Sequence, residues 1–296
     1  MRKTIINSLV KLISLTLVFV LLTLLLTGCL EGKRQNKVLL ISVDGMRPDA
    51  ISSTEYGKRL MEISSYSLSA STVHPSITLP CHMAMFHSVA PTVHGVNSNE
   101  YTPSDNLGMG IAEVLASSEM STTMFYNWEP LTNLTTPSSY VKQTLINGAT
   151  VGWEASNTQL ADSCIEYLGG EEISDFTFLY LGFLDEWGHA YGWLSEEYYY
   201  ALNESLKLIE RVIAALGDEF TVIITTDHGG HDYSHGSEMP EDMTIPVFII
   251  GAEFEGGKVF ESPSILDIAP TAIDILGVDA PEYWEGKTLY DKISSK

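Results

Sequence analysis

Short apolar runs alternate along the chain with longer segments of helical periodicity. The runs are rich in β-branched and aromatic residues and stand at Val38–Val43, Thr122–Tyr126, Phe176–Leu181, Thr221–Thr225 and Pro246–Ile250. Nearly continuous hydrophobicity over so few residues is typical of strands that are buried on both faces of a parallel sheet. We therefore expect these runs to form the core strands of one sheet.

Helical spacing is clearest in the segment Ser195–Leu216. A serine that can cap the helix is followed by two glutamates in the first turn, and apolar side chains then recur on one stripe at Leu202, Leu206, Ile209, Ile213 and Leu216. A second helix is expected after Pro270 and up to Gly277, whereas residues 101–152 are the least regular part. The alternation predicts an α/β fold in which a mostly parallel sheet carries helices on both faces.

Residues 1–28 have a separate pattern. Three bases precede an uncharged apolar run, and the small residues Thr27 and Gly28 lead to Cys29. This order is typical of a signal peptide, and the step from Leu26 to Cys29 resembles the lipobox of prokaryotic lipoproteins, in which the cysteine is lipidated. An uncleaved signal anchor is the alternative, since the apolar run is almost long enough to span a bilayer. Residues 29–37 then form a polar tether, and an extracytoplasmic location at the cell membrane is expected.

The charge balance narrows the possible partners. The chain of 296 residues has 38 Asp and Glu against 16 Lys and Arg, and a formal charge of −22, which becomes −25 if residues 1–28 and their three bases are removed. Binding along nucleic-acid polymers is not expected, because it needs Lys and Arg to displace phosphate counterions. A hydrophobic content of 45% argues against intrinsic disorder. Cys81 and Cys164 are either bonded to each other or buried as free thiols.

Acidic and histidine side chains follow three of the predicted strands. Asp44 follows the first, Asp185 and His189 follow the third, and the segment Asp227–His235 follows the fourth. In open α/β sheets the ligand site lies beyond the carboxyl ends of the strands, so the fold would bring these groups together. Carboxylate with imidazole suits Zn²⁺, Mn²⁺ or iron. A single residue of this kind is more often a turn or cap residue, but their joint placement favours a metal site.

A hydroxyl group stands at the start of another predicted helix. Thr78 precedes Pro80 and the apolar segment 83–89, which places it at a helix N-terminus, where free N–H groups favour negative charge. A threonine hydroxyl becomes a nucleophile only when a base or a metal activates it. On spacing alone, an ordinary helix cap is the simpler interpretation of Thr78.

Taken in order, these motifs resemble the type I phosphodiesterase/nucleotide pyrophosphatase family of the alkaline phosphatase superfamily. The resemblance extends over most of residues 38–277 and rests on the segments VDGMRPD (43–49), TLPCHMAMFHSVAPTVHGVNSN (78–99), LDEWGHAYGW (184–193), TTDHGGHDYSHG (225–236) and DMTIPVFIIG (242–251). It implies that residues 38–296 form one alkaline-phosphatase-like catalytic domain. The substrate implied is a small phosphate ester.

The resemblance also implies a role for each site residue. Two divalent cations, most simply zinc, are expected, with Thr78 as the nucleophile that forms a covalent phospho-enzyme. The first cation is assigned to Asp44, Asp227 and His228 with Thr78, and the second to Asp185, His189 and His235, with His231 as the alternative to His235. Asn99 is assigned as a hydrogen-bond donor to the phosphoryl oxygen.

Several activities of the superfamily share this machinery. A phosphomonoesterase, a phosphonate hydrolase and a phospho-alcohol transferase stay open as alternatives, and so does a surface lipoprotein that binds without catalysis. A sulfatase is disfavoured, because Cys81 is followed by His82 and Met83 and does not fit the C/S-x-P-x-R pattern. A nucleotide base could stack on Tyr101, Tyr126 or Trp128, although core or loop packing is the commoner role of such aromatics.

Overall fold

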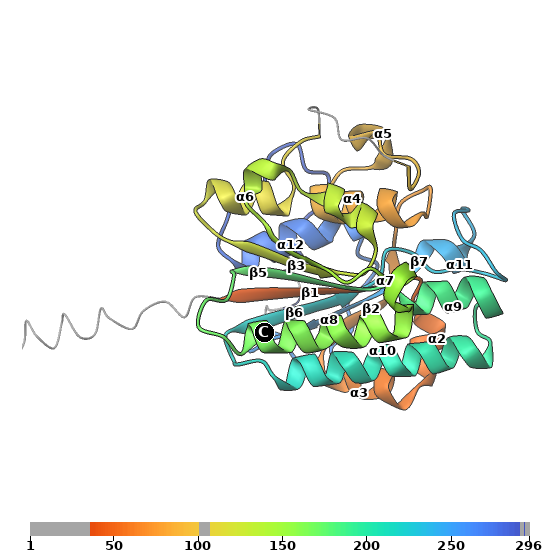
Figure 1. Cartoon of the computed structure of the whole chain (residues 1–296). Helices are drawn as coiled ribbons and strands as arrows, with labels where there is room; N and C mark the ends of the chain where they lie inside the picture. The colour runs from red at the N-terminus through yellow and green to blue at the C-terminus, as the bar shows by residue number, and fades with distance from the viewer. Residues whose placement is uncertain (1–35, 101–106, 291–292, 294–296) are drawn as a thin grey trace, which may run out of the picture. The chain divides into compact units, whose positions relative to one another are not determined.

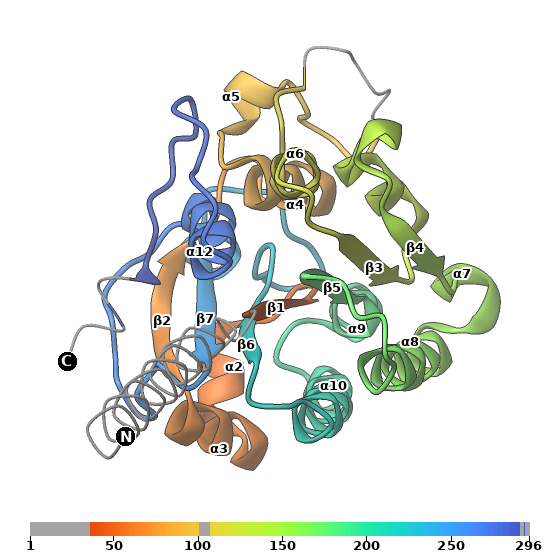
Figure 2. The same cartoon turned by 90° about the vertical axis from the view of Figure 1, so that its left-hand side faces the viewer.

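Buried apolar strands form one mixed sheet in the computed structural model, which describes residues 36–100, 107–290 and 293. The strand order is β2-β7-β6-β1-β5-β3-β4 (Figures 1 and 2). The strands are β1 (Lys37–Val43), β2 (Ser65–Ser71), β3 (Thr122–Tyr126), β4 (Lys142–Leu145), β5 (Phe176–Leu181), β6 (Phe220–Thr225) and β7 (Thr244–Ile250). All five predicted strands are therefore present, and the mostly parallel α/β class is confirmed.

Helices cover both faces of this sheet, as the alternation predicted. The α-helices are α2 (Pro48–Ser53), α3 (Glu55–Ile63), α4 (Thr78–His87), α5 (Pro91–His94), α6 (Ile111–Ser117), α7 (Gly148–Val151), α8 (Trp153–Leu168), α9 (Phe183–Tyr191), α10 (Glu196–Ala214), α11 (Pro240–Met243) and α12 (Ile268–Ile275). In Figure 1, α4, α6 and α12 lie above the sheet and α3, α8 and α10 lie below it.

Alternate residues of the central strand enter two different cores. Val38 and Leu40 of β1 pack with α4, α6 and α12, whereas Leu39, Ile41 and Val43 pack with α3, α8 and α10. All five side chains are fully buried. Because β1 is hydrogen-bonded to β5 on one side and to β6 on the other, both in parallel, the carboxyl ends of these three strands lie next to one another.

Some elements differ from the sequence prediction. β7 runs antiparallel to both of its neighbours, β2 and β6. The sequence did not predict this direction, because a strand that is buried on both faces has the same composition in either direction. The edge strands β2 and β4 were not predicted, since both carry polar and exposed residues. The long helix was predicted correctly: Ser195 caps α10, with its side chain accepting a hydrogen bond from the backbone of Tyr198. The last helix starts at Ile268, two residues before Pro270.

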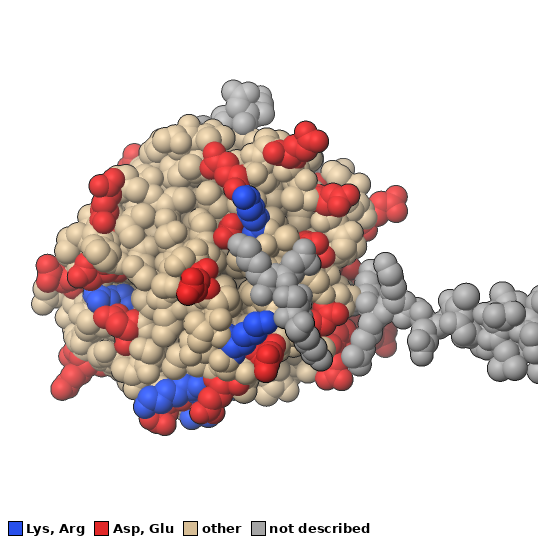
Figure 3. Space-filling model, turned by 180° about the vertical axis from the view of Figure 1, so that it is seen from behind, with Lys and Arg blue, Asp and Glu red and all other residues tan. Residues whose placement is uncertain are grey.

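The predicted signal peptide over residues 1–28 and the lipidation site at Cys29 lie outside the described residues. Of the tether, Asn36 and Lys37 are described, and Lys37 already belongs to β1. No helix in the described ranges is long and apolar enough to cross a membrane. Cys81 and Cys164 are buried free thiols. Figure 3 shows Asp and Glu side chains spread over one face with few Lys and Arg, in accord with the negative formal charge.

Candidate metal centre and nucleophile

Three aspartates meet at the adjacent carboxyl ends of β1, β5 and β6. Asp44 directly follows β1, Asp185 lies in the first turn of α9 after β5, and Asp227 stands two residues after β6. Their exposed fractions are 2%, 8% and 0%. The sequence placed these carboxylates at strand ends, and the strand order brings them together.

The first group of candidate ligands consists of Asp44, Asp227 and His228. One ligand atom from each lies within 4.8 Å of the others. The Nε2 atom of His228 is 3.4 Å from Asp44 Oδ1 and 3.2 Å from Asp227 Oδ2. All three residues are buried. This is the set that the resemblance assigns to one cation.

The second group adjoins the first. His189 Nε2 is 3.4 Å from Asp185 Oδ2 and 3.1 Å from His235 Nε2, and His235 Nε2 is 3.7 Å from Asp185 Oδ1. The ring of His235 also stacks on His228 with centroids 3.7 Å apart, and Asp185, His228 and His235 can bring ligand atoms within 4.8 Å of one another. His228 therefore faces both groups, whereas the His189 side chain is 41% exposed.

The alternative ligand, His231, points elsewhere. Its Nδ1 atom is 2.7 Å from Asp242 Oδ1, and it belongs to neither group of candidate ligands among the described residues. The geometry therefore places His235, and not His231, beside Asp185.

Backbone carbonyl groups determine which nitrogen of each imidazole carries the proton. The Nδ1 atoms of His228, His189 and His235 lie 2.8, 2.9 and 2.8 Å from the carbonyl oxygens of Gly229, Tyr233 and Ser76. We assign the proton to Nδ1 in each neutral ring, which leaves a lone pair on Nε2. Three Nε2 lone pairs then point toward carboxylate oxygens and toward one another, an arrangement that a cation would stabilise.

Each of the three aspartates also has one oxygen atom without a partner. Asp44 Oδ1, Asp185 Oδ1 and Asp227 Oδ2 are buried and have no hydrogen-bond partner. The second oxygen of Asp44 accepts a hydrogen bond from Tyr180, and the second oxygen of Asp227 accepts one from Thr226. A buried carboxylate oxygen without a partner is costly unless it binds a cation. The residues present therefore fit divalent metal ions with mixed oxygen and nitrogen ligands.

The electrostatics of the centre follow from burial. Burial raises the pKa of Asp44 and of Asp185, and repulsion from Asp227 raises both further. Burial would also raise the pKa of Asp227, but attraction to His228 and His82 in their protonated forms lowers it below its ordinary value. Burial lowers the pKa of His235 to about 3, so its ring is neutral at pH 7 and can donate its lone pair.

Thr78 lies beside the first group. It is the first residue of α4, is 5% exposed, and its Oγ1 atom is 3.3 Å from His228 Nε2. The backbone N–H of Leu79 donates to Asn99 Oδ1 at 3.0 Å. With its oxygen engaged, Asn99 has its amide NH₂ available as a donor next to the helix N-terminus. Thr78 and Asn99 are thus neighbours, as the predicted roles require.

Sequence reasoning missed His82, which connects the candidate nucleophile Thr78 to the candidate ligand Asp227. Its Nδ1 atom is 2.8 Å from the carbonyl oxygen of Thr78 and 3.4 Å from Asp227 Oδ2, and its Nε2 atom is 2.9 Å from Ser42 Oγ. The ring is fully buried. The available signal was spacing, because His82 stands one helical turn after Thr78. Tyr180 was also missed, because a tyrosine within a buried apolar strand is usually interpreted as a core residue.

The turn after β1 requires glycine. Gly45 has φ +69°, and a Cβ atom there would lie 3.0 Å from Asp185 Oδ1 and 3.2 Å from the Asp185 backbone. Trp193 Nε1 and the Tyr198 hydroxyl both donate to the Gly45 carbonyl, at 3.0 and 2.8 Å. Glycine therefore allows Asp44 and Asp185 to approach, and two aromatic side chains hold the turn.

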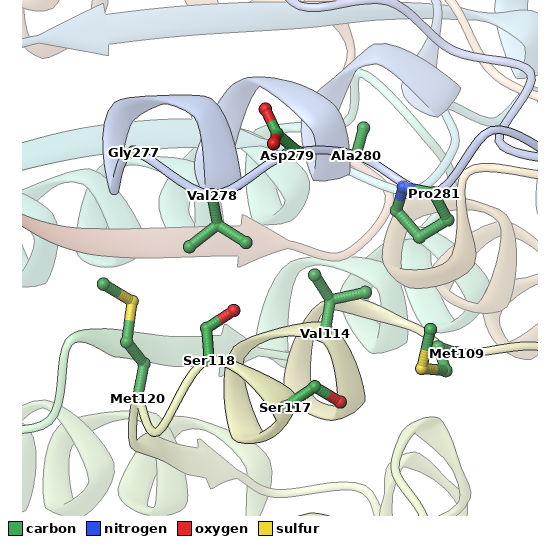
Figure 4. Close-up of a pocket in the computed structure, with 10 residues that line it drawn as sticks. All are labelled: Met109, Val114, Ser117, Ser118, Met120, Gly277, Val278, Asp279, Ala280 and Pro281. Atoms are coloured by element: carbon green, nitrogen blue, oxygen red, sulfur yellow. The ribbon is translucent and has the colours of Figure 1, made fainter.

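Other features lie apart from this centre. A pocket of about 580 Å³ runs between α6 and the segment after α12 and shares no residue with the metal groups (Figure 4). Tyr126 is buried and hydrogen-bonded to Thr132 and Gln143, which excludes it from stacking on a base, and Trp128 is partly buried against the core. Tyr101 lies outside the described residues.

The chain is similar over part of its length to two kinds of mutase. The chain is 30% identical over 153 residues to a 2,3-bisphosphoglycerate-independent phosphoglycerate mutase of Clostridioides difficile (strain 630), covering 47% of this chain and 28% of that protein. It is 31% identical over 119 residues to a phosphopentomutase of Alkaliphilus metalliredigens (strain QYMF), covering 40% and 30%. The chain thus spans less than a third of the length of these relatives.

Solved structures share the fold at low identity. Human ectonucleotide pyrophosphatase/phosphodiesterase 5 has a TM-score of 0.74 at 16% identity over 88% of this chain and 100% of that one. A phosphonate monoester hydrolase of Agrobacterium radiobacter has a TM-score of 0.69 at 16% identity over 88% and 77%. A putative sulfatase of Bacteroides thetaiotaomicron has a TM-score of 0.70 at 15% identity over 88% and 75%. These neighbours are members of the alkaline phosphatase superfamily.

Family membership rests on the sequence itself. Residues 38–243, which contain every candidate ligand, Thr78 and Asn99, match the family described as type I phosphodiesterase/nucleotide pyrophosphatase. The chain therefore belongs to this family.

Proposed function

We propose that this protein hydrolyses small phosphodiesters or pyrophosphates through a phospho-threonine at Thr78, with two divalent cations, most simply Zn²⁺, held by the two groups of ligands. One observation carries the proposal. Three imidazole Nε2 lone pairs and three partnerless carboxylate oxygens face one another next to a helix-terminal hydroxyl. Membership of a phosphodiesterase family supports the reaction class.

The side chains define the steps. Thr78 Oγ1 forms a bond to phosphorus while the bond from phosphorus to the leaving oxygen breaks, and water then cleaves the phospho-threonine and restores the hydroxyl. Bound cations would lower the pKa of the hydroxyl and offset the charge on both oxygens of the displacement. The Asn99 amide and the N-terminus of α4 supply donors where negative charge grows. His82 keeps the first turn of α4 in register with Asp227.

The engagement of one arginine supports our choice of diesters over monoesters as substrates. Arg47 lies next to the metal-binding loop, but its guanidinium is paired with both carboxylate oxygens of Asp49 and donates to the carbonyl of Gly230. It is thus engaged and does not offer its charge to a substrate. A monoester dianion carries one more negative charge than a diester and gains more from a free guanidinium.

Metal removal and a substrate panel test the proposal. We expect the zinc-loaded protein to hydrolyse bis-p-nitrophenyl phosphate faster than p-nitrophenyl phosphate, and we expect a chelator to abolish both rates until zinc or manganese is added back. The measurement is p-nitrophenol release, with a phosphonate monoester and a nucleotide in parallel. A preference for the monoester or the phosphonate would favour those alternative activities. Zinc binding without any hydrolysis would support the non-catalytic alternative.

We also propose that Cys29 is lipidated after removal of residues 1–28 and holds the domain at the outer side of a cell membrane. Support comes from the signal-peptide pattern of residues 1–28 and from the position of Cys29 directly after it. Labelling with a fatty acid checks this: incorporation is expected in the wild type and not in Cys29→Ala, and equal incorporation would refute it.

A further inference from the structure

Asp242 is a buried carboxylate that belongs to neither metal group. It lies in α11, just before β7, and is 0% exposed. Its Oδ1 atom is 2.7 Å from His231 Nδ1, and its Oδ2 atom accepts hydrogen bonds from the backbone N–H and the hydroxyl of Ser237, at 2.9 and 2.7 Å. Both oxygens are therefore engaged with protein, unlike those of the three ligand aspartates.

The two partners of Asp242 flank His235 in the sequence. His231 stands four residues before His235, and Ser237 stands two residues after it. The Asp242 carboxylate therefore holds the loop on both sides of this candidate metal ligand. Backbone contacts add to this attachment: Gly229 N–H donates to the Asp242 carbonyl, and Gly230 N–H donates to the Glu241 carbonyl, both at 2.9 Å. These contacts with α11 therefore fix the position of the loop.

Ser76 completes the arrangement from the opposite side. Its hydroxyl donates to the Ser237 carbonyl at 2.8 Å, and its own carbonyl oxygen is 2.8 Å from His235 Nδ1. A continuous chain of hydrogen bonds thus runs from Asp242 through Ser237 and Ser76 to His235. It fixes both the position of the ring and the nitrogen that carries its proton.

We propose that Asp242, His231 and Ser237 form a positioning bracket that holds His235 Nε2 toward Asp185, and that the bracket sets the affinity of the second cation site. This inference rests on the proposed two-cation function. The bracket residues are positioning residues, since none of them reaches the candidate ligand atoms in the described part of the chain. Outer partners of metal ligands commonly contribute about 10- to 100-fold in metal affinity.

Zinc titration of the full chain against a chromophoric chelator tests the bracket. In Asp242→Asn, an amide NH₂ replaces one oxygen that faces only donors, and we expect one of two zinc sites to weaken by about 10- to 100-fold while the other is unchanged. Asp232→Asn is the matched control, because it removes one exposed negative charge from the same loop, and it should titrate like the wild type. His231→Gln, which keeps a donor, should lie closer to the wild type than His231→Ala.

The outcomes separate this inference from the proposed function. Equal zinc affinities in Asp242→Asn and Asp232→Asn would overturn the bracket, and so would a wild type that binds fewer than two zinc ions. Two zinc ions in the wild type without hydrolysis of any ester would refute the proposed activity and leave the bracket to be decided by the variants. If Asp242→Asn does not fold, the His231→Ala and His231→Gln pair decides, because both leave the Ser237 contacts intact.

Discussion

Thr78→Ala is expected to abolish turnover of a phosphodiester while both cation sites still bind zinc. The variant removes the hydroxyl whose oxygen lies 3.3 Å from His228 Nε2, but it keeps the carboxylate and imidazole groups of both ligand sets. Loss of a nucleophile that forms a covalent intermediate costs several orders of magnitude in kcat, and we expect a drop of about 10³-fold or more. The measurement is steady-state release of p-nitrophenol at saturating zinc.

Two comparisons make this result specific. Thr78→Ser keeps a hydroxyl at the N-terminus of α4 and should retain measurable turnover. Zinc titration of Thr78→Ala should still show two bound zinc ions, which would show that the lost turnover is not caused by loss of metal. Wild-type rates in Thr78→Ala would assign the attack to another group, such as water.

Asp44→Asn should have opposite effects on activity and on the stability of the metal-free protein. Asn at this position can still accept the Tyr180 hydrogen bond but replaces a charged ligand by a neutral amide. Activity and affinity of the first site should fall by at least about 100-fold, since even outer partners of metal ligands reach that value. The metal-free variant should be more stable than the metal-free wild type, by on the order of 1–2 kcal/mol, because a buried repulsive charge is gone.

The expected gain in stability of metal-free Asp44→Asn follows from the direction in which the pKa of Asp44 is shifted. Burial and the charges of Asp227 and Asp185 raise the pKa of Asp44 in the folded state. The metal-free fold therefore loses stability as the pH rises above the ordinary pKa of an aspartate, and the loss is complete above the raised pKa. Urea unfolding at pH 8 with a chelator measures the gain, and the same titration with zinc should show a loss. Asp279→Asn, which changes an exposed residue apart from both groups of candidate ligands, is the matched control. A less stable metal-free Asp44→Asn would contradict the assigned electrostatics.

Much of the fold was predictable because each core strand is a short apolar run that can be recognised in the sequence. Every apolar run that was expected as a strand is one, and Asp44, Asp185 and Asp227 meet because each directly or nearly follows a strand of the central group. The direction of β7 was not predictable, since a strand buried on both faces has the same composition in either direction. The edge strands β2 and β4 carry polar residues and gave no apolar run.

The supporting residues of the site were not predictable for a different reason. His82, Tyr180 and Asp242 act through contacts between elements that are far apart in the chain, such as Tyr180 with Asp44 and His82 with Asp227. Hydrophobic periodicity does not report such pairs. The choice of His235 over His231 also depended on the path of one loop, which the Asp242 contacts determine.

Mass spectrometry of the acid-quenched reaction tests the central claim most directly. Full-length, zinc-loaded protein is mixed with bis-p-nitrophenyl phosphate, quenched during the first turnover and digested. We predict that the peptide containing Thr78 carries one p-nitrophenyl phosphoryl group, with the adduct on Thr78, and that the same peptide from Thr78→Ala carries none. Turnover without any adduct on Thr78, at the same rate in the wild type and in Thr78→Ala, would contradict the account.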